Sequence, residues 1–287
     1  MSLRTKRFAK STALRLALAT HSGVSPSLTR RVLRVAKVGY DPPARPVTYP
    51  GGAPSACCIS IDFDATIPQR EAPNRVGTES VVALGEKYNI PMTWAICGRT
   101  AENDRRAYDL VASAPVKHDI GVHTYSHIDV SKCSEAELEQ EIEKCIEVLA
   151  LSAPPKTFIF PWNRTGHFDA VKRSGFISYR AKERTIGYPR RMNGLWNIAP
   201  VFYLDQNALG ASRLIQRTMD FSIDSGSVFH LWFHPWSVVD PSPEAYAKRV
   251  LEPTFAYMDK KRSEGKLSVL TMRGLAEWLE ATPGDGA

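Results

Sequence analysis

The sequence has few of the features that mark disulfide-stabilised, membrane-spanning or nucleotide-binding proteins. Its five cysteines are odd in number and have no C-x-x-C spacing, which argues against a disulfide framework or a thiolate zinc site and favours a reducing compartment. No run approaches the ~18 consecutive apolar residues of a transmembrane helix. A glycine fingerprint, a phosphate-binding loop and an internal repeat are also missing, and these absences weigh against an open nucleotide-binding sheet.

The net positive charge of the chain is confined to the N-terminal arm. The formal net charge is +7, but residues 1–50 hold ten Lys and Arg against one acid, Asp41, so the other residues carry a net charge of −2. The basic segments lack interleaved aromatic residues, so we expect no nucleic-acid binding. The apolar run 13–19 is interrupted by Arg15 and is shorter than the core of a usual secretory signal. We therefore expect a cytoplasmic protein or one at the inner membrane surface, with export as the alternative.

The first 54 residues are predicted to form a basic arm and linker. Residues 28–37 can form a helix with apolar residues on one side and cations on the other. Such a helix either contacts an anionic membrane surface peripherally or packs on the domain, and a solvated, partly disordered arm is the third alternative. Residues 41–54 are rich in proline and glycine. The remaining residues, 55–287, are long and apolar enough for one domain with a substantial core.

Short apolar runs alternate with longer amphipathic runs beyond residue 54. The predicted strands cover 57–63, 92–96, 119–123, 157–160, 177–179, 228–233 and 267–270. The predicted helices cover 80–88, 101–113, 134–149, 168–174, 209–223, 244–262 and 273–280. This alternation predicts an α/β fold of parallel units, and we expect a barrel of about seven strands. In such folds the functional groups gather at the C-terminal ends of the strands.

Two aspartates end the first predicted strand, in the stretch ISIDFDAT at 59–66. Side chains alternate along a strand, so Asp62 and Asp64 point the same way as Ser60 and their charges repel each other. A cation, a bound proton or exposure to water at the strand end can offset this repulsion. Exposure is the ordinary structural explanation.

Histidines follow two other predicted strands. His123 and His127 face the same way if the chain turns helically after the strand, as two ligands of one metal require. Hydrogen-bonded structural histidines are the alternative. In FHLWFHP, His230, Trp232 and His234 line one face of a strand. A lone histidine there is usually a core residue, but beside the other two strand ends His234 becomes a candidate general acid.

Together, the three strand ends predict one hydrolytic metal site. Two histidines and one carboxylate leave coordination positions open, and Zn²⁺ is the simplest occupant, with Co²⁺, Ni²⁺ or Mn²⁺ as alternatives. The second carboxylate would use the water that the cation polarises. The predicted site comprises Asp62, Asp64, His123, His127 and His234.

These motifs resemble those of the polysaccharide deacetylases of carbohydrate esterase family 4, over roughly residues 55–275. The D-x-D at 62–64 is similar to a variant of the first motif, and HTYSH at 123–127 fits the second. FIFPWN at 158–163 resembles the third, and residues 231–234 occupy the place of the last. The resemblance implies a distorted (β/α)7-type barrel that removes acetyl groups from an N-acetylated glycan or glycan precursor.

The resemblance also implies roles for individual residues. Asp62 would be the general base, His234 the general acid, and the backbone N–H of Trp162 an oxyanion stabiliser. The implied metal ligands are Asp64, His123 and His127.

One family feature is missing, because the arginine that usually holds the base aspartate falls at Ile159. Arg164 and Arg180 are the candidates to replace it. This departure keeps two alternatives open: a hydrolase of small linear or cyclic amides, and a non-catalytic carbohydrate-binding protein. Four tryptophans are candidate sugar-stacking walls, with core packing as the alternative for each: Trp94, Trp162, Trp232 and Trp236.

Overall fold

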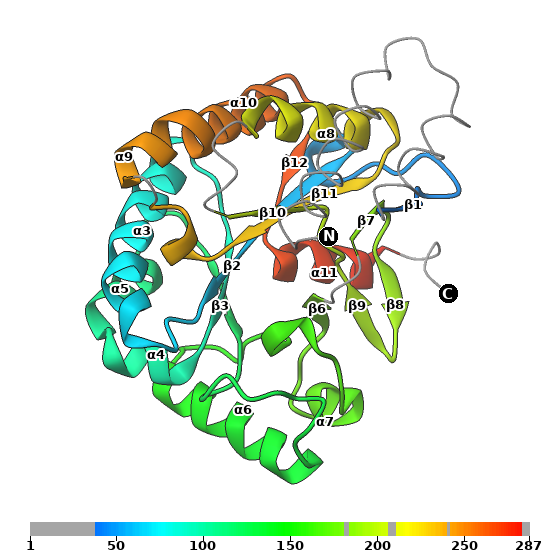
Figure 1. Ribbon diagram of the computed structural model, residues 1–287. Coiled ribbons are helices and arrows are strands. Elements are labelled where there is room, and N and C mark those ends of the chain that lie inside the picture. The colour runs from blue at the N-terminus through cyan, green and yellow to red at the C-terminus, as the bar shows by residue number, and fades with distance from the viewer. Residues whose placement is uncertain (1–37, 181–183, 206–210, 240–241, 283–287) are drawn as a thin grey trace, which may run out of the picture.

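The structure, a computed structural model, describes residues 38–180, 184–205, 211–239 and 242–282. These residues form a mixed α/β fold around one strongly curled sheet of twelve strands (Figure 1). The sheet order is β1-β7-β11-β2-β3-β4-β5-β6-β9-β8, with β10 paired to β11 and β12 to β2. The predicted barrel-like α/β class is therefore confirmed, although the sheet has more strands than the seven expected.

All seven predicted strands are present, each within one residue of its predicted bounds. Five further strands were not predicted, because a strand of three residues is too short for its alternation to be recognised. The strands are β1 (Gly39–Asp41), β2 (Ala56–Phe63), β3 (Thr93–Ile96), β4 (Asp119–Val122), β5 (Thr157–Ile159), β6 (Ser178–Arg180), β7 (Thr185–Gly187), β8 (Arg190–Met192), β9 (Leu195–Asn197), β10 (Phe202–Leu204), β11 (Val228–Phe233) and β12 (Ser268–Val269).

Helices surround the curled sheet. In Figure 1, α8 and α10 lie along the top, α9, α3, α5 and α4 on the left, and α6 and α7 at the bottom. Their bounds are α3 (Pro68–Lys87), α4 (Gly98–Asn103), α5 (Arg105–Ala112), α6 (Glu135–Leu149), α7 (Phe168–Arg173), α8 (Ser212–Asp224), α9 (Pro243–Tyr246), α10 (Glu252–Ser263) and α11 (Met272–Ala281).

Two helix predictions were wrong in extent. Helix α3 begins twelve residues before the predicted start, because its polar first turns and Pro73 hide the apolar period. The helix predicted over 101–113 is divided at Asp104, whose carboxylate accepts the Ala107 N–H at 3.2 Å and caps α5. The capping box of α6 is confirmed: Ser134 Oγ accepts the Glu137 N–H, and the Glu137 carboxylate accepts the Ser134 N–H.

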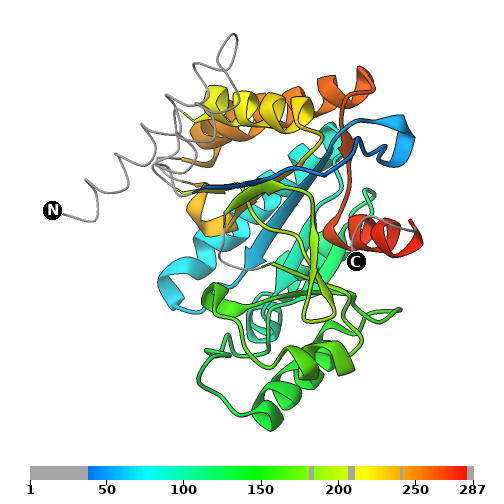
Figure 2. The same cartoon turned by 90° about the vertical axis from the view of Figure 1, so that its right-hand side faces the viewer.

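The two ends of the strands have different roles. At the amino-terminal end, Asp119 opens β4 and accepts the Arg273 N–H at 3.3 Å, which fixes the start of α11. Figure 2 shows α11 on that side, apart from the other helices. Strand β2 is buried along its whole length, so its side chains reach solvent neither above nor below the sheet. Open positions for chemistry therefore lie at the carboxyl-terminal ends.

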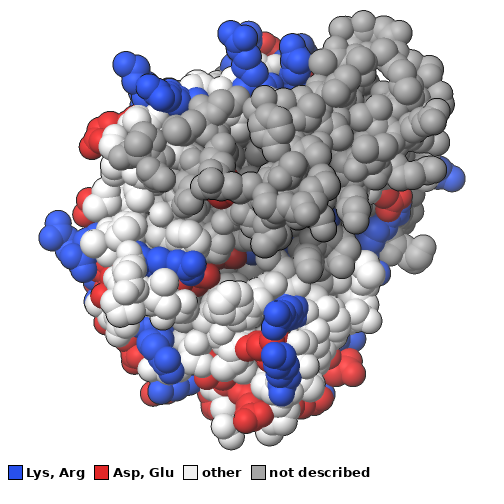
Figure 3. Space-filling view, in the orientation of Figure 1, with Lys and Arg blue, Asp and Glu red and all other residues white. Residues whose placement is uncertain are grey.

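The surface and the cysteines are consistent with an ordinary globular domain. All five cysteines are free. Lys and Arg are interspersed with Asp and Glu over the described part of the face in Figure 3. Among the described helices, none combines the length and the apolar composition needed to cross a bilayer.

The predicted arm lies for the most part outside the described residues, which begin at Val38, so nothing is concluded about its basic segment 28–37. Within the predicted segment of arm and linker, residues 1–54, β1 pairs with β7 at the edge of the sheet. The domain boundary at residue 54 stays a prediction.

Candidate active site

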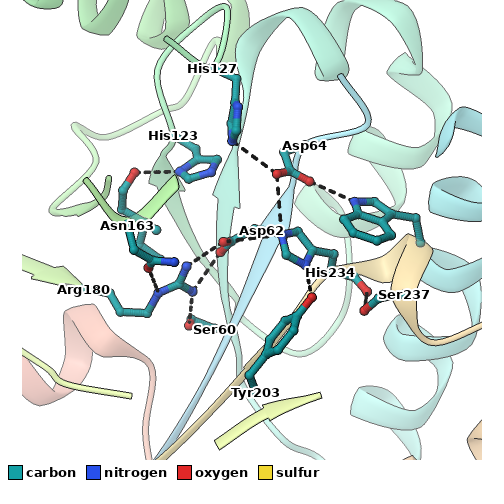
Figure 4. Close-up of polar contacts among 12 residues, drawn as sticks. Ser60, Asp62, Asp64, His123, His127, Asn163, Arg180, Tyr203, His234 and Ser237 are labelled. Carbon is teal, nitrogen blue, oxygen red and sulfur yellow. Dashed lines mark hydrogen bonds and ion pairs between the residues drawn. The ribbon is translucent and has the colours of Figure 1, made fainter. Parts of the chain in front are cut away.

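The predicted site residues meet at the carboxyl-terminal ends of β2, β4 and β11. Strands β11, β2, β3 and β4 are parallel neighbours in that order, so their carboxyl ends share one edge (Figure 4). Asp62 and Asp64 are only 3% and 4% exposed, which excludes water at the strand end as the compensation for their charges. The charges must therefore be balanced by other groups.

Asp64, His123 and His127 form a donor cluster, in which one ligand atom from each lies within 4.8 Å of the others. The Nε2 atom of His127 lies 3.2 Å from Oδ2 of Asp64. His123 Nδ1 donates to the Ile159 carbonyl at 2.6 Å, which leaves the lone pair on Nε2, and burial lowers the pKa of His123 to about 4. A neutral, oriented imidazole beside a carboxylate fits a divalent metal such as Zn²⁺.

The loop from His123 to His127 is not helical, contrary to the expectation. Thr124 and His127 have φ angles of 58° and 63°, in the left-handed region. Glu141 of α6 holds this loop, since its carboxylate accepts the Ser126 N–H at 2.6 Å and the Ser126 hydroxyl at 2.7 Å. The two histidines thus converge through a clamp from a neighbouring helix, and their spacing of four has no helical origin.

Arg180, the last residue of β6, is the arginine that contacts Asp62. Its Nη1 and Nη2 donate to the two carboxylate oxygens at 2.8 and 2.5 Å, and the guanidinium is fully buried. Burial alone would raise the pKa of Asp62, but the charge and the hydrogen bonds of Arg180 hold this pKa well below its usual range. Arg164, the other candidate, forms an exposed ion pair with Asp129.

A second layer of hydrogen bonds fixes Arg180. Its Nη1 donates to Ser60 Oγ at 2.9 Å, and Ser60 donates to His230 Nε2 at 2.8 Å. The acceptor role of Nε2 follows because His230 Nδ1 donates to the Ile198 carbonyl at 2.9 Å. Burial, together with the charge of Arg180, lowers the pKa of His230 to about 3, so this histidine is neutral. The guanidinium carbon of Arg180 lies over the ring of Trp232, 4.1 Å from the ring centre.

His234 lies between the two aspartates and Tyr203 (Figure 4). Its Nε2 is 3.5 Å from Asp64 Oδ2 and 3.9 Å from Asp62 Oδ2, while its Nδ1 is 3.2 Å from the Tyr203 hydroxyl. Burial lowers the pKa of His234, and the two carboxylates oppose that effect. Sequence reasoning did not include Tyr203, because nothing local connects β10 with the end of β11.

The tryptophans divide into core and site residues. Trp94 is fully buried between Phe63 and His118, so its proposed contact with sugar was wrong. Trp162 is 57% exposed, and its ring lies 4.7 Å from that of His127. Trp162 and Asn163 both have positive φ, at 58° and 52°. Two successive strained residues cost about 1–3 kcal/mol each, and such strain is concentrated at functional sites.

A family model for polysaccharide deacetylases matches residues 29–169. The chain belongs to the polysaccharide deacetylase family. A protein described as a polysaccharide deacetylase from Mycobacterium smegmatis is 18% identical, with a TM-score of 0.70 over 83% of this chain and 94% of that chain. A second one so described, from Pseudomonas aeruginosa PAO1, is 15% identical, with a TM-score of 0.63 over 82% and 94%. An allantoinase is 15% identical, with a TM-score of 0.61 over 84% and 95%. These similarities show a shared fold.

Most members of the polysaccharide deacetylase family are metal-dependent amide hydrolases, and the family implies acetylated carbohydrate substrates. In this chain Ile159, the last residue of β5, stands at the arginine position of the third motif, and Arg180 from the neighbouring strand β6 contacts Asp62 instead. Arg180 was one of two candidates from the sequence, and it reaches Asp62 because β6 pairs with β5 in the sheet.

Proposed function

We propose that this chain is a metal-dependent deacetylase that hydrolyses the N-acetyl group of a sugar or polysaccharide. The observation that carries the proposal is the pair of buried aspartates at the carboxyl-terminal end of β2. Asp62 is held ionised by Arg180, and Asp64 lies in a donor cluster with His123 and His127. One carboxylate is thus prepared to accept a proton and the other to hold a cation.

The residues support a hydrolytic mechanism. A divalent cation, for which we propose Zn²⁺, would polarise the acetyl carbonyl and lower the pKa of a water. Asp62 accepts a proton from the attacking water, and His234 delivers a proton to the leaving amine. In support of these roles, Asp62 Oδ2 and His234 Nε2 are 3.9 Å apart, so the proposed proton acceptor and proton donor are neighbours. The backbone N–H of Trp162 stabilises the oxyanion.

The proposed contacts with the sugar come from residues around the candidate metal site. The exposed indole of Trp162 offers an apolar face to a sugar ring beside His127. Arg164, half exposed next to Asp129, is proposed to contact the glycan further out. The ring of Trp232 lies against the guanidinium of Arg180, so we propose that it acts on the substrate through the Arg180–Asp62 pair.

We place the enzyme in the cytoplasm or at the inner membrane surface, in keeping with its free cysteines and basic arm.

A hydrolase of small linear or cyclic amides is the second candidate. The side chains of Asp62, Asp64, His127 and His234 are at most 12% exposed, and such limited access suits a small amide as well as the acetyl group of a glycan. The non-catalytic alternative was motivated by the missing arginine, and the contact of Arg180 with Asp62 removes that motive.

The deciding experiment measures acetate release by the full chain loaded with Zn²⁺. We expect release from N-acetylglucosamine oligomers and no turnover of allantoin, a small cyclic amide. Asp62→Asn should retain the metal and lose about 10²–10⁴-fold in rate, the usual contribution of a general base. Turnover of allantoin alone would establish the second candidate. Absence of both reactions in the loaded protein would contradict the proposal.

A further inference from the structure

Trp236 contacts the predicted metal ligand Asp64. It lies in the short helix η3 (Pro235–Ser237), two residues after His234. Its indole Nε1 donates to Oδ1 of Asp64 at 2.9 Å. The other oxygen of Asp64, Oδ2, faces His127 Nε2 at 3.2 Å and His234 Nε2 at 3.5 Å (Figure 4). The two oxygens of this carboxylate therefore have different surroundings.

The indole N–H can only donate a hydrogen bond, so it competes with a cation for one oxygen of Asp64 and cannot itself coordinate a metal. A hydrogen bond to an ionised carboxylate is about twice as strong as one between neutral groups. With Oδ1 so engaged, Asp64 has one oxygen left for a cation. Three single-atom ligands, from Asp64, His123 and His127, would leave coordination positions open for substrate and water.

Trp236 is held in place by groups that do not depend on a metal. The guanidinium carbon of Arg70, on α3, lies 3.9 Å from the centre of the indole. The ring of His234 is stacked on the indole at 4.5 Å, with an angle of 29° between the planes. Helix α3 also abuts η3 directly, since a Cβ atom at Gly77 would lie 2.1 Å from the Pro235 carbonyl oxygen. The indole is thus oriented before any cation arrives.

We propose that Trp236 is a positioning residue for the metal centre, which holds Oδ1 of Asp64 so that Asp64 coordinates through Oδ2 alone. The inference rests on the proposed function, because it presumes that Asp64, His123 and His127 hold a cation. It adds a residue from outside the four motifs that the sequence identified. It also gives a reason for the close approach of α3 and η3 at Gly77, since this approach helps to hold Trp236 in place.

The test compares Trp236→Phe with the wild-type full chain. Phenylalanine keeps an aromatic ring between Arg70 and His234 and removes only the N–H. We expect the dissociation constant for Zn²⁺, measured by competition with a chelator, to rise about 10–100-fold, as is typical when an outer partner of a ligand is lost. The visible spectrum of the Co²⁺-loaded variant should show weaker bands, because Asp64 can then bind through both oxygens and raise the coordination number.

The chain offers a matched control in Trp196→Phe. The indole of Trp196 donates to Glu280 at 2.8 Å, so this variant also loses an indole–carboxylate bond, but far from the site. Its Zn²⁺ affinity and Co²⁺ spectrum should equal those of the wild type. Arg70→Leu is a second variant, which keeps the N–H and loosens the indole, and it should weaken Zn²⁺ binding by a smaller factor than Trp236→Phe.

The outcomes separate this inference from the proposed function. Unchanged Zn²⁺ affinity and an unchanged Co²⁺ spectrum in Trp236→Phe would overturn the role of Trp236 and leave the deacetylase proposal intact. Equal losses in Trp236→Phe and Trp196→Phe would also overturn it, since the effect would then be a general one. A wild-type chain that binds neither metal would overturn both proposals.

Discussion

Asp62 lies near the end of β2 and Asp64 directly after it, and the fold compensates their charges in different ways. Asp62 has a permanent cation, because Arg180 pairs with both of its oxygens in a fully buried arrangement. Asp64 has neutral or titratable partners: an indole N–H, His127 and His234. The charge of Asp62 is therefore compensated by an arginine, whereas Asp64 has no arginine or lysine partner among the described residues.

This difference explains why one strand end can serve two chemical roles. A buried carboxylate that is paired with arginine stays ionised and is available to a proton from water. A buried carboxylate without a cation of its own is costly, and an imported cation offsets that cost. The asymmetry is thus set by the neighbours that other elements supply.

The largest expected effect distinguishes the two aspartates by metal content. Asp64→Asn should weaken divalent metal binding on the order of 10³-fold, because loss of one ligand removes a large share of the binding free energy. Asp62→Asn should keep close to the wild-type metal content, since its partner is Arg180. Elemental mass spectrometry of both purified variants measures this. Equal loss in the two would mean that the aspartates share the cation and that the comparison is wrong.

The next effect concerns the stability of the Asp62 side. Arg180→Met leaves a buried carboxylate without its cation, so the free energy of unfolding should fall by about 3–5 kcal/mol. The control Arg164→Met breaks an exposed pair and should cost about 1 kcal/mol or less. Urea denaturation at pH 7 measures both variants. Adding Asp62→Asn to Arg180→Met should restore part of the loss, and no recovery would show that the charge is not the cause.

The smallest effect of a single substitution concerns the acid sensitivity of the metal-free protein. Burial lowers the pKa of His118 to about 4 and that of His230, near Arg180, to about 3, against 6.5 for an ordinary histidine. Below pH 6.5 the unfolded chain therefore binds more protons than the folded one, so the free energy of unfolding falls as the pH is lowered. Each unit of difference in pKa corresponds to at most about 1.4 kcal/mol per group.

Urea denaturation at pH 7, 6 and 5 in the presence of a chelator measures this trend. His230→Gln should show a shallower dependence on pH than the wild type, because one of the histidines with a lowered pKa is gone. A free energy of unfolding that is constant from pH 7 to pH 5 would contradict the assignment of His230 as a buried neutral histidine.

The sequence by itself determined the elements and the residue types of the site. Alternating apolar residues located seven strands to within one residue, and the strand-end rule gathered five site residues from three segments. The capping box of α6 was also readable, since Ser134 and Glu137 are three positions apart. These features depend on local periodicity and on the parallel arrangement of β/α units, and both can be recognised from short stretches of sequence.

Only the tertiary structure decided which partner each site residue has. Arg180 meets Asp62 across 118 positions, and Trp236 meets Asp64 across 172. The clamp of Glu141 on Ser126 spans 15 positions and replaces the helical turn expected there. Contacts of this kind depend on the order and the curl of the sheet and on the close approach of α3 to η3, and no local pattern encodes them. The residue types of the candidate site could therefore be predicted from the sequence, whereas their partners and orientations depend on the packing.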